Sequence, residues 1–449
     1  MGPTEKLARF VLDTDFQDIP REAIELSKRL FLDCMGSALA AVVEPAGRII
    51  QEYIRETGAT EEARLIGTSI ASSAPNAAFA NGVMAHAISF DDSAPSHPTV
   101  TILPVLLALG EKYKFSGRQL LAAQVLGYDV FLRFNAATKR AETIRLGGWH
   151  PTGFFGTVAA SAMTAKLLKL DLGKTRIAFG IAASVSGGLS QNIGTMTMPL
   201  HAGNSARNGM VAALVAQRGF TADDEILEGQ FGLLNALCGK DGYSIDGLTA
   251  NLGDPFKVIS PGINIKFYPS CWAHHRAVDA MLHLVEKHSL SAAEVESIEC
   301  DLLVDKPIGR YIHPKTDLQA KYSVGYNVAV ALLDGRVGIA QFLPEKIFDA
   351  KTQEVLAKVK HVPQEWSKEV PDKHMVRVRL KDGREYSYGV EHCKGEAKAK
   401  PLTRDELLVK YRTCARRVLS EDKIERSIEI IEQLEDTKNI DELMEIVTV

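Results

Sequence analysis

The chain has 449 residues, of which 46% are hydrophobic and 24% are charged, and this composition is typical of a globular protein rather than a disordered or fibrous one. Its length exceeds what one simple hydrophobic core holds, so we expect two domains or three. The 52 Lys and Arg residues nearly balance the 56 Asp and Glu residues, giving a formal net charge of −4. The sequence therefore offers no basic excess for a nucleic-acid backbone, and we expect no nucleic-acid partner.

The cysteines and the first residues of the chain indicate a compartment. Six cysteines are scattered without a CxxC pair, at positions 34, 238, 271, 300, 393 and 414. This scatter favours a reducing compartment over a disulfide framework and supplies no zinc or iron–sulfur ligand set. The first 20 residues are charged and amphipathic and lack the apolar centre of a signal peptide. We therefore predict a cytoplasmic protein.

The first 250 residues have an almost wholly helical pattern, because apolar residues recur at spacings of three and four in segments such as 19–42 and 116–141. Ser116 is a plausible N-cap for the second of these helices. Residues 177–206 carry no charged side chain, but they contain too many Ser, Asn, Gln and Gly residues for a membrane span, which needs about 20 mainly apolar residues. We predict small-residue helices packed closely against each other and no membrane partner.

The pattern changes near residue 265. Residues 296–304 and 374–390 alternate like β-strands, and Lys381 to Arg384 in the second segment has the composition of a hairpin turn. Residues 323–335 and 353–362 have a helical pattern, and charged amphipathic helices follow to the end. We predict a helical domain over 1–265, an α+β domain over 266–395 and C-terminal helices over 396–449 that rejoin the first domain. Three consecutive domains are the alternative.

A first polar cluster lies at residues 81–100. Asp91, Asp92, Ser93 and His97 follow one predicted helix and precede the next, on a turn interrupted by proline, so their side chains can converge on a cleft. The alternative is that Asp and Ser residues at this position are ordinary helix caps.

A second cluster surrounds His150, which follows two glycines and Trp149 and opens a helix of small residues. The free N–H groups and positive dipole end of a helix N-terminus favour a substrate carboxylate. They disfavour imidazolium, so His150 can act as a neutral imidazole base. A surface histidine that precedes a proline is the alternative.

A third cluster lies near the predicted domain junction and contains Lys266, Tyr268, His274, His275 and Arg276. Ligand sites favour such junctions. Adjacent histidines cannot share one helix face, so we expect at most one of the pair to reach a site. The spacing of zinc-binding histidines is absent, and we predict no metal site.

Two further segments carry candidate residues. His201 and Asn204 lie at the end of the uncharged run, and Arg207 follows it. Arg207 could bind a substrate carboxylate through two hydrogen bonds, although a solvated arginine is the alternative. Tyr326 lies in an apolar helix, where a core tyrosine is the alternative. No dinucleotide fingerprint, Walker lysine or nucleophile elbow is present, so nothing supports a nucleotide cofactor or a serine hydrolase.

Six separated motifs resemble, in order, those of the MmgE/PrpD family, which includes 2-methylcitrate dehydratase, cis-aconitate decarboxylase and iminodisuccinate epimerase. The motifs are NGVMAHAISFDDSAPSHPTVTILPVLLALGE, GWHPTGFFGTVAASAMTAKLLKLD, PLHAGNSARNG, KFYPSCWAHHRAVDA, AKYSVGY and EHCKGEAKAKPLTRDELLVKY. The resemblance implies a mainly α fold with an α+β lid, in which an all-helical domain is completed by the C-terminus. It also implies a homodimer and an active site between the helical domain and the lid.

The resemblance also implies site residues. The predicted catalytic residues are His97, His150, His275 and Tyr326, and the predicted substrate-binding residues are Asp91, Ser93, His201, Arg207 and Lys266. Two positions depart from the decarboxylase branch, because Ser89 replaces an Asp and Met198 replaces a Lys. The missing acid and cation weaken the decarboxylase interpretation.

The family's reactions share one difficult step, the formation or quenching of a carbanion-like centre beside a carboxylate, and none requires a redox cofactor. We therefore predict a cofactor-independent lyase like 2-methylcitrate dehydratase, which eliminates water from a small hydroxy di- or tricarboxylate by histidine-mediated proton transfer. The alternatives are an epimerase of a small dicarboxylate, then a decarboxylase, and finally a dimer that binds anions without catalysis.

Overall fold

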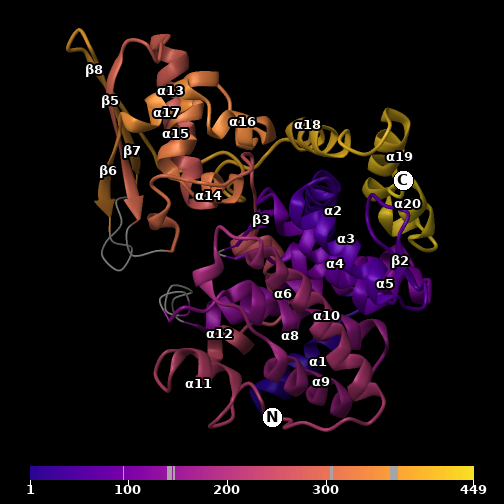
Figure 1. Ribbon diagram of the computed structural model, residues 1–449. Coiled ribbons are helices and arrows are strands. Elements are labelled where there is room, and N and C mark those ends of the chain that lie inside the picture. Colours follow the sequence, from indigo (N-terminus) through magenta and orange to yellow (C-terminus); the bar gives the residue numbers. More distant parts are fainter. Residues whose placement is uncertain (95, 139–143, 145–146, 304–306, 365–372) are drawn as a thin grey trace. The chain divides into compact units, whose positions relative to one another are not determined.

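The computed structural model describes residues 1–94, 96–138, 144, 147–303, 307–364 and 373–449. The chain forms two compact units. Unit 1 comprises Met1–Ser190, Thr197–Ile263 and Thr403–Val449, and unit 2 comprises Gln191–Met196 and Asn264–Leu402. Unit 1 is almost wholly helical, and unit 2 contains a four-stranded sheet with helices (Figure 1). The mainly α fold with an inserted α+β part, predicted from the sequence, is confirmed.

Unit 1 is built from helices of the N-terminal half and of the C-terminus. Two short strands, β1 (Ala63–Arg64) and β2 (Ala71–Ser72), pair antiparallel between α3 and α4. The helices are α1 (Pro3–Asp13), α2 (Arg21–Ala41), α3 (Pro45–Thr57), α4 (Ala74–Ala87), α5 (Thr99–Tyr113), α6 (Gly117–Ala137), α8 (Pro151–Leu167), α9 (Leu172–Val185), α10 (Thr197–Gln217), α11 (Leu233–Cys238), α12 (Ile245–Thr249), α18 (Arg404–Ala415), α19 (Glu421–Glu432) and α20 (Asp441–Ile446).

Helix α10 packs against both α4 and α8 at the centre of unit 1, and small residues allow the close approach. A Cβ added at Gly82 of α4 would lie 2.8 Å from the Cα of Gly203 in α10. A Cβ added at Gly209 of α10 would lie 2.3 Å from the carbonyl oxygen of Thr157 in α8. The predicted close packing of small-residue helices is therefore confirmed, and these contacts fix where the polar ends of the helices lie.

The uncharged run 177–206 is split between α9 and α10, with a loop between them. Among the residues that the structure describes, no single helix is both long enough and apolar enough to cross a membrane. One bent pair, α2 with α3, meets the criteria of length and composition jointly, with an angle of 82° between its helices.

Local signals account for the start of α6. Ser116 accepts a hydrogen bond from the backbone N–H of Gln119, whose side chain accepts one from the backbone N–H of Ser116. This reciprocal capping satisfies two N–H groups that the helix itself cannot pair. Ser116 is therefore the N-cap, as the sequence predicts.

Unit 2 contains a sheet with the strand order β6-β5-β7-β8. The strands are β5 (Val295–Leu303), β6 (Val359–Gln364), β7 (His374–Leu380) and β8 (Glu385–Val390). Strands β7 and β8 form the predicted hairpin, with Arg379 opposite Glu385. Helices α13 (His275–His288) and α15 (Val324–Asp334) cover the sheet (Figure 1). Unit 2 also holds β4 (Asn264–Ile265), α14 (Asp317–Lys321), α16 (Pro344–Ile347) and α17 (Ala350–Ala357).

One predicted element of unit 2 is wrong in part. The helical pattern over 353–362 is helix only as far as Ala357, because Val359 begins strand β6. This strand pairs in parallel with β5, with Val359 opposite Ile298. Pairing with residues 61 positions earlier in the chain is a tertiary effect that overrides the local pattern. The ends of the predicted helix 116–141 and of the predicted strand 296–304 lie outside the described residues.

Candidate active site

The turn between α4 and α5 places acidic and imidazole side chains inside unit 1. His86 lies in the last turn of α4, Asp91 follows it, β3 (Asp92–Ser93) comes next, and His97 precedes α5. His86 and Asp91 are fully buried, and the His97 side chain is 14% exposed. The sequence prediction of a polar turn between two helices is confirmed.

Asp91 holds two imidazoles. Its Oδ1 is 3.0 Å from Nδ1 of His86, and its Oδ2 is 2.7 Å from Nδ1 of His97. Nδ1 of His97 is also 2.8 Å from the carbonyl oxygen of Asp92. A backbone carbonyl only accepts hydrogen bonds, so Nδ1 of His97 carries a proton, and Nε2 of the neutral ring keeps its lone pair. Asp91 therefore holds the His97 ring in one orientation, and its predicted contact with a substrate stays a prediction.

A second pair of imidazoles comes from α8 and α10. His150 is the N-cap residue of α8, and its Nδ1 is 3.1 Å from Nδ1 of His201. Two nitrogens at this distance share one proton. Burial, and then the nearby charge of His86, lower the pKa of His201 to about 4, so this imidazole is neutral at neutral pH. Gly188 leaves room for the ring, because a Cβ there would lie 3.0 Å from Cγ of His201.

The two pairs adjoin each other. The ring centre of His150 is 6.3 Å from that of His86 and 6.4 Å from that of His97, and the His86 and His97 centres are 4.4 Å apart. Oγ1 of Thr152 lies 3.4 Å from Nε2 of His150. Four imidazoles from α4, the following turn, α8 and α10 therefore form one group, which we call the histidine cluster (His86, His97, His150 and His201).

Asp92 has a different role from its neighbour Asp91. Its Oδ2 accepts hydrogen bonds from the backbone N–H and the hydroxyl of Thr99, at the start of α5. Burial, and then the charge of Asp91, raise the pKa of Asp92 well above its usual range. Asp92 is not an ordinary cap, because the N-cap of α5 is Pro98, but its carboxylate accepts a hydrogen bond from the first N–H group of that helix.

His86 was not among the predicted site residues. The signal that could have revealed it is its place in the last turn of α4, five residues before Asp91. Its Nε2 is buried and has no hydrogen-bond partner among the described residues. A buried imidazole with one nitrogen held by a carboxylate is a candidate for proton transfer.

Two other predicted residues of unit 1 lie near the cluster in sequence. Ser93 is buried in β3, beside the Asp91 turn. Arg207 lies six residues after His201 on α10, where its guanidinium carbon is 4.8 Å from the ring centre of Phe79. Its hydrogen bonds go to the side-chain oxygens of Asn204 and Asn208. Its predicted contact with a substrate carboxylate stays a prediction.

The remaining predicted residues belong to unit 2. His275 is buried at the start of α13, with its ring centre 4.8 Å from that of Trp272 and 5.1 Å from that of Tyr268. Lys266 is fully buried. The hydroxyl of buried Tyr326 donates a hydrogen bond to the backbone carbonyl of Gln341, and this favours the alternative of a core tyrosine. The predicted meeting of His275 with His97 and His150 stays a prediction.

His274 is also buried, and burial is the main reason that its pKa falls to about 3. Both adjacent histidines therefore lie inside unit 2, and the expectation that at most one of them reaches a site stays a prediction.

Comparison with known proteins identifies the family. The N-terminal domain of MmgE/PrpD proteins matches residues 5–246, and their C-terminal domain matches residues 268–436. The chain belongs to the MmgE/PrpD family. It is 29% identical over 456 residues to the cis-aconitate decarboxylase of Mus musculus, a match that covers 97% of this chain and 91% of the relative. The enzyme of the same name from Homo sapiens is also 29% identical and covers 97% of this chain and 92% of its own. That of Aspergillus terreus is 27% identical and covers 99% and 96%.

Two members of the histidine cluster of this MmgE/PrpD protein form a set of three possible metal ligands with Asp91, because the side chains of His86, Asp91 and His97 offer atoms within 4.8 Å of one another. Two ligands of a tetrahedral zinc ion, each about 2.0–2.1 Å from it, stand roughly 3.3 Å apart. Here the separations between nitrogen and oxygen are 2.7 and 3.0 Å, which are hydrogen-bond distances. The donor set therefore fits a hydrogen-bonded triad better than a metal centre.

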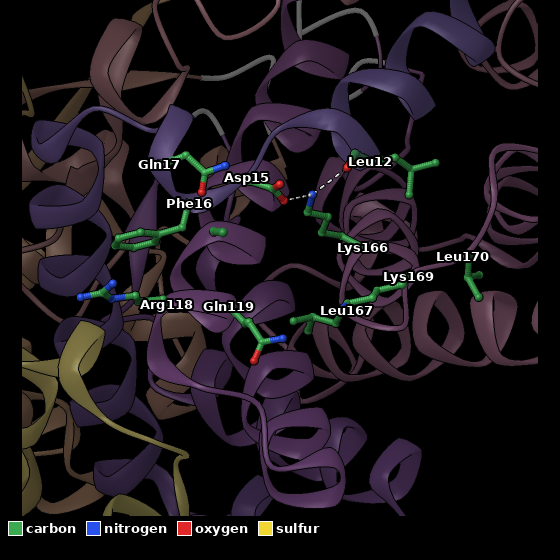
Figure 2. Close-up of a pocket in the computed structure, with 11 residues that line it drawn as sticks. Leu12, Asp15, Phe16, Gln17, Arg118, Gln119, Lys166, Leu167, Lys169 and Leu170 are labelled. Atoms are coloured by element: carbon green, nitrogen blue, oxygen red, sulfur yellow. Dashed lines mark hydrogen bonds and ion pairs between the residues drawn. The ribbon is translucent and has the colours of Figure 1, made fainter.

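A separate pocket of this MmgE/PrpD protein, with a volume of about 480 Å³, lies at the ends of α1 and α8 and the start of α6. Figure 2 shows Lys166 extending from α8 toward Asp15 and the carbonyl oxygen of Leu12, to which it donates hydrogen bonds of 3.0 and 2.7 Å. Arg118 and Lys169 also line the pocket. None of the predicted site residues is among its lining residues, so the candidate active site is the histidine cluster.

Proposed function

We propose that this protein is a cofactor-independent lyase that eliminates water from a hydroxy di- or tricarboxylate by histidine-mediated proton transfer. Family membership and the decarboxylase relatives support an enzyme of the lyase class. The observation that supports elimination of water in particular is that two hydrogen-bonded pairs able to transfer protons lie at the histidine cluster. One is His97 on Asp91, and the other is His150 on His201.

Elimination of water needs a base and an acid at the same time. In the proposed reaction Nε2 of His97 removes the proton beside a carboxylate, and the carboxylate of Asp91 stabilises the imidazolium that forms. The electrons of the broken C–H bond form the carbon–carbon double bond, and the hydroxyl leaves as water with a proton from His150. The positive end of the α8 dipole disfavours the imidazolium of His150, but the negative charge of a bound polycarboxylate offsets that dipole and favours the protonated ring that this step needs. Arg207 is the proposed carboxylate-binding group of unit 1, and the positive end of the α8 dipole adds to it. The substrate-binding role of Lys266 stays a prediction from the family resemblance.

A second candidate is decarboxylation, which the names of the relatives support. In that reaction the bond to a carboxylate carbon breaks, carbon dioxide leaves, and the electron pair left on carbon takes a proton from an imidazolium. This step needs one acid rather than an acid and a base. Ser89 and Met198, which replace an acid and a cation of the decarboxylase branch, are the reason that we place it second.

The test is proton NMR of the purified protein in D₂O with 2-methylcitrate, citrate, malate and cis-aconitate, combined with detection of carbon dioxide. New vinyl signals without carbon dioxide would support elimination. Carbon dioxide from cis-aconitate would support the decarboxylase instead. Deuterium at the carbon beside a carboxylate, with no other change, would favour an epimerase, and both lyase proposals would then be wrong.

Substitution of the proposed proton-transfer residues tests the mechanism. We expect His97→Gln and His150→Gln each to lower kcat at least tenfold, because a positioned acid or base contributes roughly 10²–10⁴-fold. We expect the same of His275→Gln, whose catalytic role is a prediction from the family resemblance. Circular dichroism should show an intact fold. Wild-type turnover in the first two variants would contradict the assignment.

A further inference from the structure

A lysine from the C-terminal helix α18 lies directly behind the turn that carries Asp91. Nζ of Lys410 donates a hydrogen bond of 2.6 Å to the carbonyl oxygen of Phe90, which is 320 positions earlier in the chain. It also lies 2.5 Å from Oδ1 of Asp33 in α2 and 4.0 Å from the ring centre of Phe90. The side chains of Lys410 and Asp33 are 3% and 0% exposed. One ammonium group therefore joins α2, α18 and the backbone beside Asp91.

The charges around Lys410 explain why a cation is needed there. The pKa of buried Cys34 is raised by burial and then by Asp92, Asp91 and Asp33, and it is lowered by Lys410. The three carboxylates thus share one buried region, where like charges repel strongly because little water screens them. A cation held on the carbonyl oxygen of Phe90, the residue before Asp91, favours the ionised form of a carboxylate on that turn.

We propose that Lys410 is a positioning residue for the proposed reaction. It fixes the carbonyl of Phe90 and the charge of the adjacent carboxylate of Asp91, which in turn orients His97. It does not itself contact the reacting atoms. This proposal rests on the proposed function and deepens it, because it makes the C-terminal segment part of the catalytic apparatus.

The first variants are Lys410→Met, which removes the charge, and Lys410→Arg, which keeps it. For Lys410→Met we expect kcat to fall at least tenfold while KM changes less than about threefold. We also expect the acid limb of the pH–kcat profile to move to higher pH, because loss of a nearby cation favours the protonated forms of Asp91 and His97. Lys410→Arg should retain most of kcat and the wild-type acid limb.

Lys410→Met leaves the carboxylate of Asp33 buried without its cation and can unfold the protein. The double variant Asp33→Asn, Lys410→Met removes both charges and keeps the proposal falsifiable. If Lys410 positions Asp91 through the carbonyl of Phe90, the double variant should melt nearer the wild-type temperature but keep the low kcat. Its acid limb should lie between those of wild type and Lys410→Met, because Asp33→Asn removes one of the repelling carboxylates. Wild-type kcat in the double variant would overturn the proposal, because Lys410 would then only neutralise Asp33.

A matched control is Lys423→Met in α19. Nζ of Lys423 also donates to a backbone carbonyl of the C-terminal segment, that of Thr448, at 2.8 Å. We expect it to leave kcat and the pH profile unchanged.

Titration of the imidazole protons by NMR in wild type and Lys410→Met needs no turnover. If the titration of His97 moves but no carboxylate is converted, the proposed function fails while the positioning role stands. If the titration does not move, the positioning role fails whatever the reaction is.

Discussion

The packing of α10 against α8 predicts the effect of adding a single methyl group at Gly209. In Gly209→Ala the new Cβ would lie 2.3 Å from the carbonyl oxygen of Thr157, 2.5 Å from Cβ of Ala160 and 2.8 Å from the backbone nitrogen of Ser161. An ordinary contact needs at least 3.4 Å. Two of these atoms belong to the backbone of α8, so no side-chain rotation relieves the overlap, and the helices must separate by about 1 Å.

The separation has a cost in stability and a cost in activity. Overpacking of this kind destabilises a fold by about 1–3 kcal/mol, and the higher helix propensity of alanine returns about 1 kcal/mol. We therefore expect a net loss of up to about 2 kcal/mol, or roughly 4–8 °C in Tm at about 2–4 °C per kcal/mol for a unit of this size. Helix α8 carries His150 and α10 carries His201, so kcat should also fall, by up to about 100-fold for a displacement near 1 Å.

The assay is thermal unfolding followed by circular dichroism, together with kcat on the substrate identified by NMR. Gly173→Ala is the matched control, because Gly173 is an exposed helical residue of α9 whose added Cβ would lie 3.4 Å from the side chain of Asp171. This control should keep kcat and gain up to about 1 kcal/mol. The reasoning is refuted if Gly209→Ala melts at the same temperature as the control and retains wild-type turnover.

Two further predictions concern buried charge. Arg133 is fully buried and donates hydrogen bonds to Asp129 and, at 2.7 and 2.8 Å, to the carbonyl oxygens of Ala250 and Asn251. We expect Arg133→Met to lower the free energy of unfolding by about 3–5 kcal/mol, because Asp129 would stay buried without its cation. Urea titration measures this loss, and a value below about 1 kcal/mol would contradict the prediction. The pKa of His201 is about 4 in the folded protein against 6.5 for an ordinary histidine. The unfolded chain therefore binds a proton here more readily than the folded protein. The contribution of His201 to stability is complete above pH 6.5 and is lost as the pH falls toward 4. In His201→Asn the decline of Tm between pH 6.5 and 4 should therefore be shallower than in wild type, and equal slopes would show that another group controls it.

Much of the fold could be predicted from the sequence because it depends on local interactions. The period of apolar residues indicated the helices of unit 1, and Ser116 marked the start of α6. The turn residues between Leu380 and Glu385 predicted the hairpin of β7 and β8. The polar turn around Asp91 and the place of His150 at a helix start were also predicted, because both follow from the order of residues along the chain.

Only the tertiary structure decided which of these side chains meet. His150 and His201 are 51 positions apart, and their contact depends on how α8 and α10 pack across Gly209. The same holds for Lys410, whose ammonium reaches the Asp91 turn from the last helices of the chain. The partner of a buried carboxylate depends on the rotation and depth of neighbouring helices, and long-range packing sets both. The sequence by itself therefore indicated most of the helices and strands and three of the four histidines of the cluster, while close contact between distant helices decided which imidazoles share a proton.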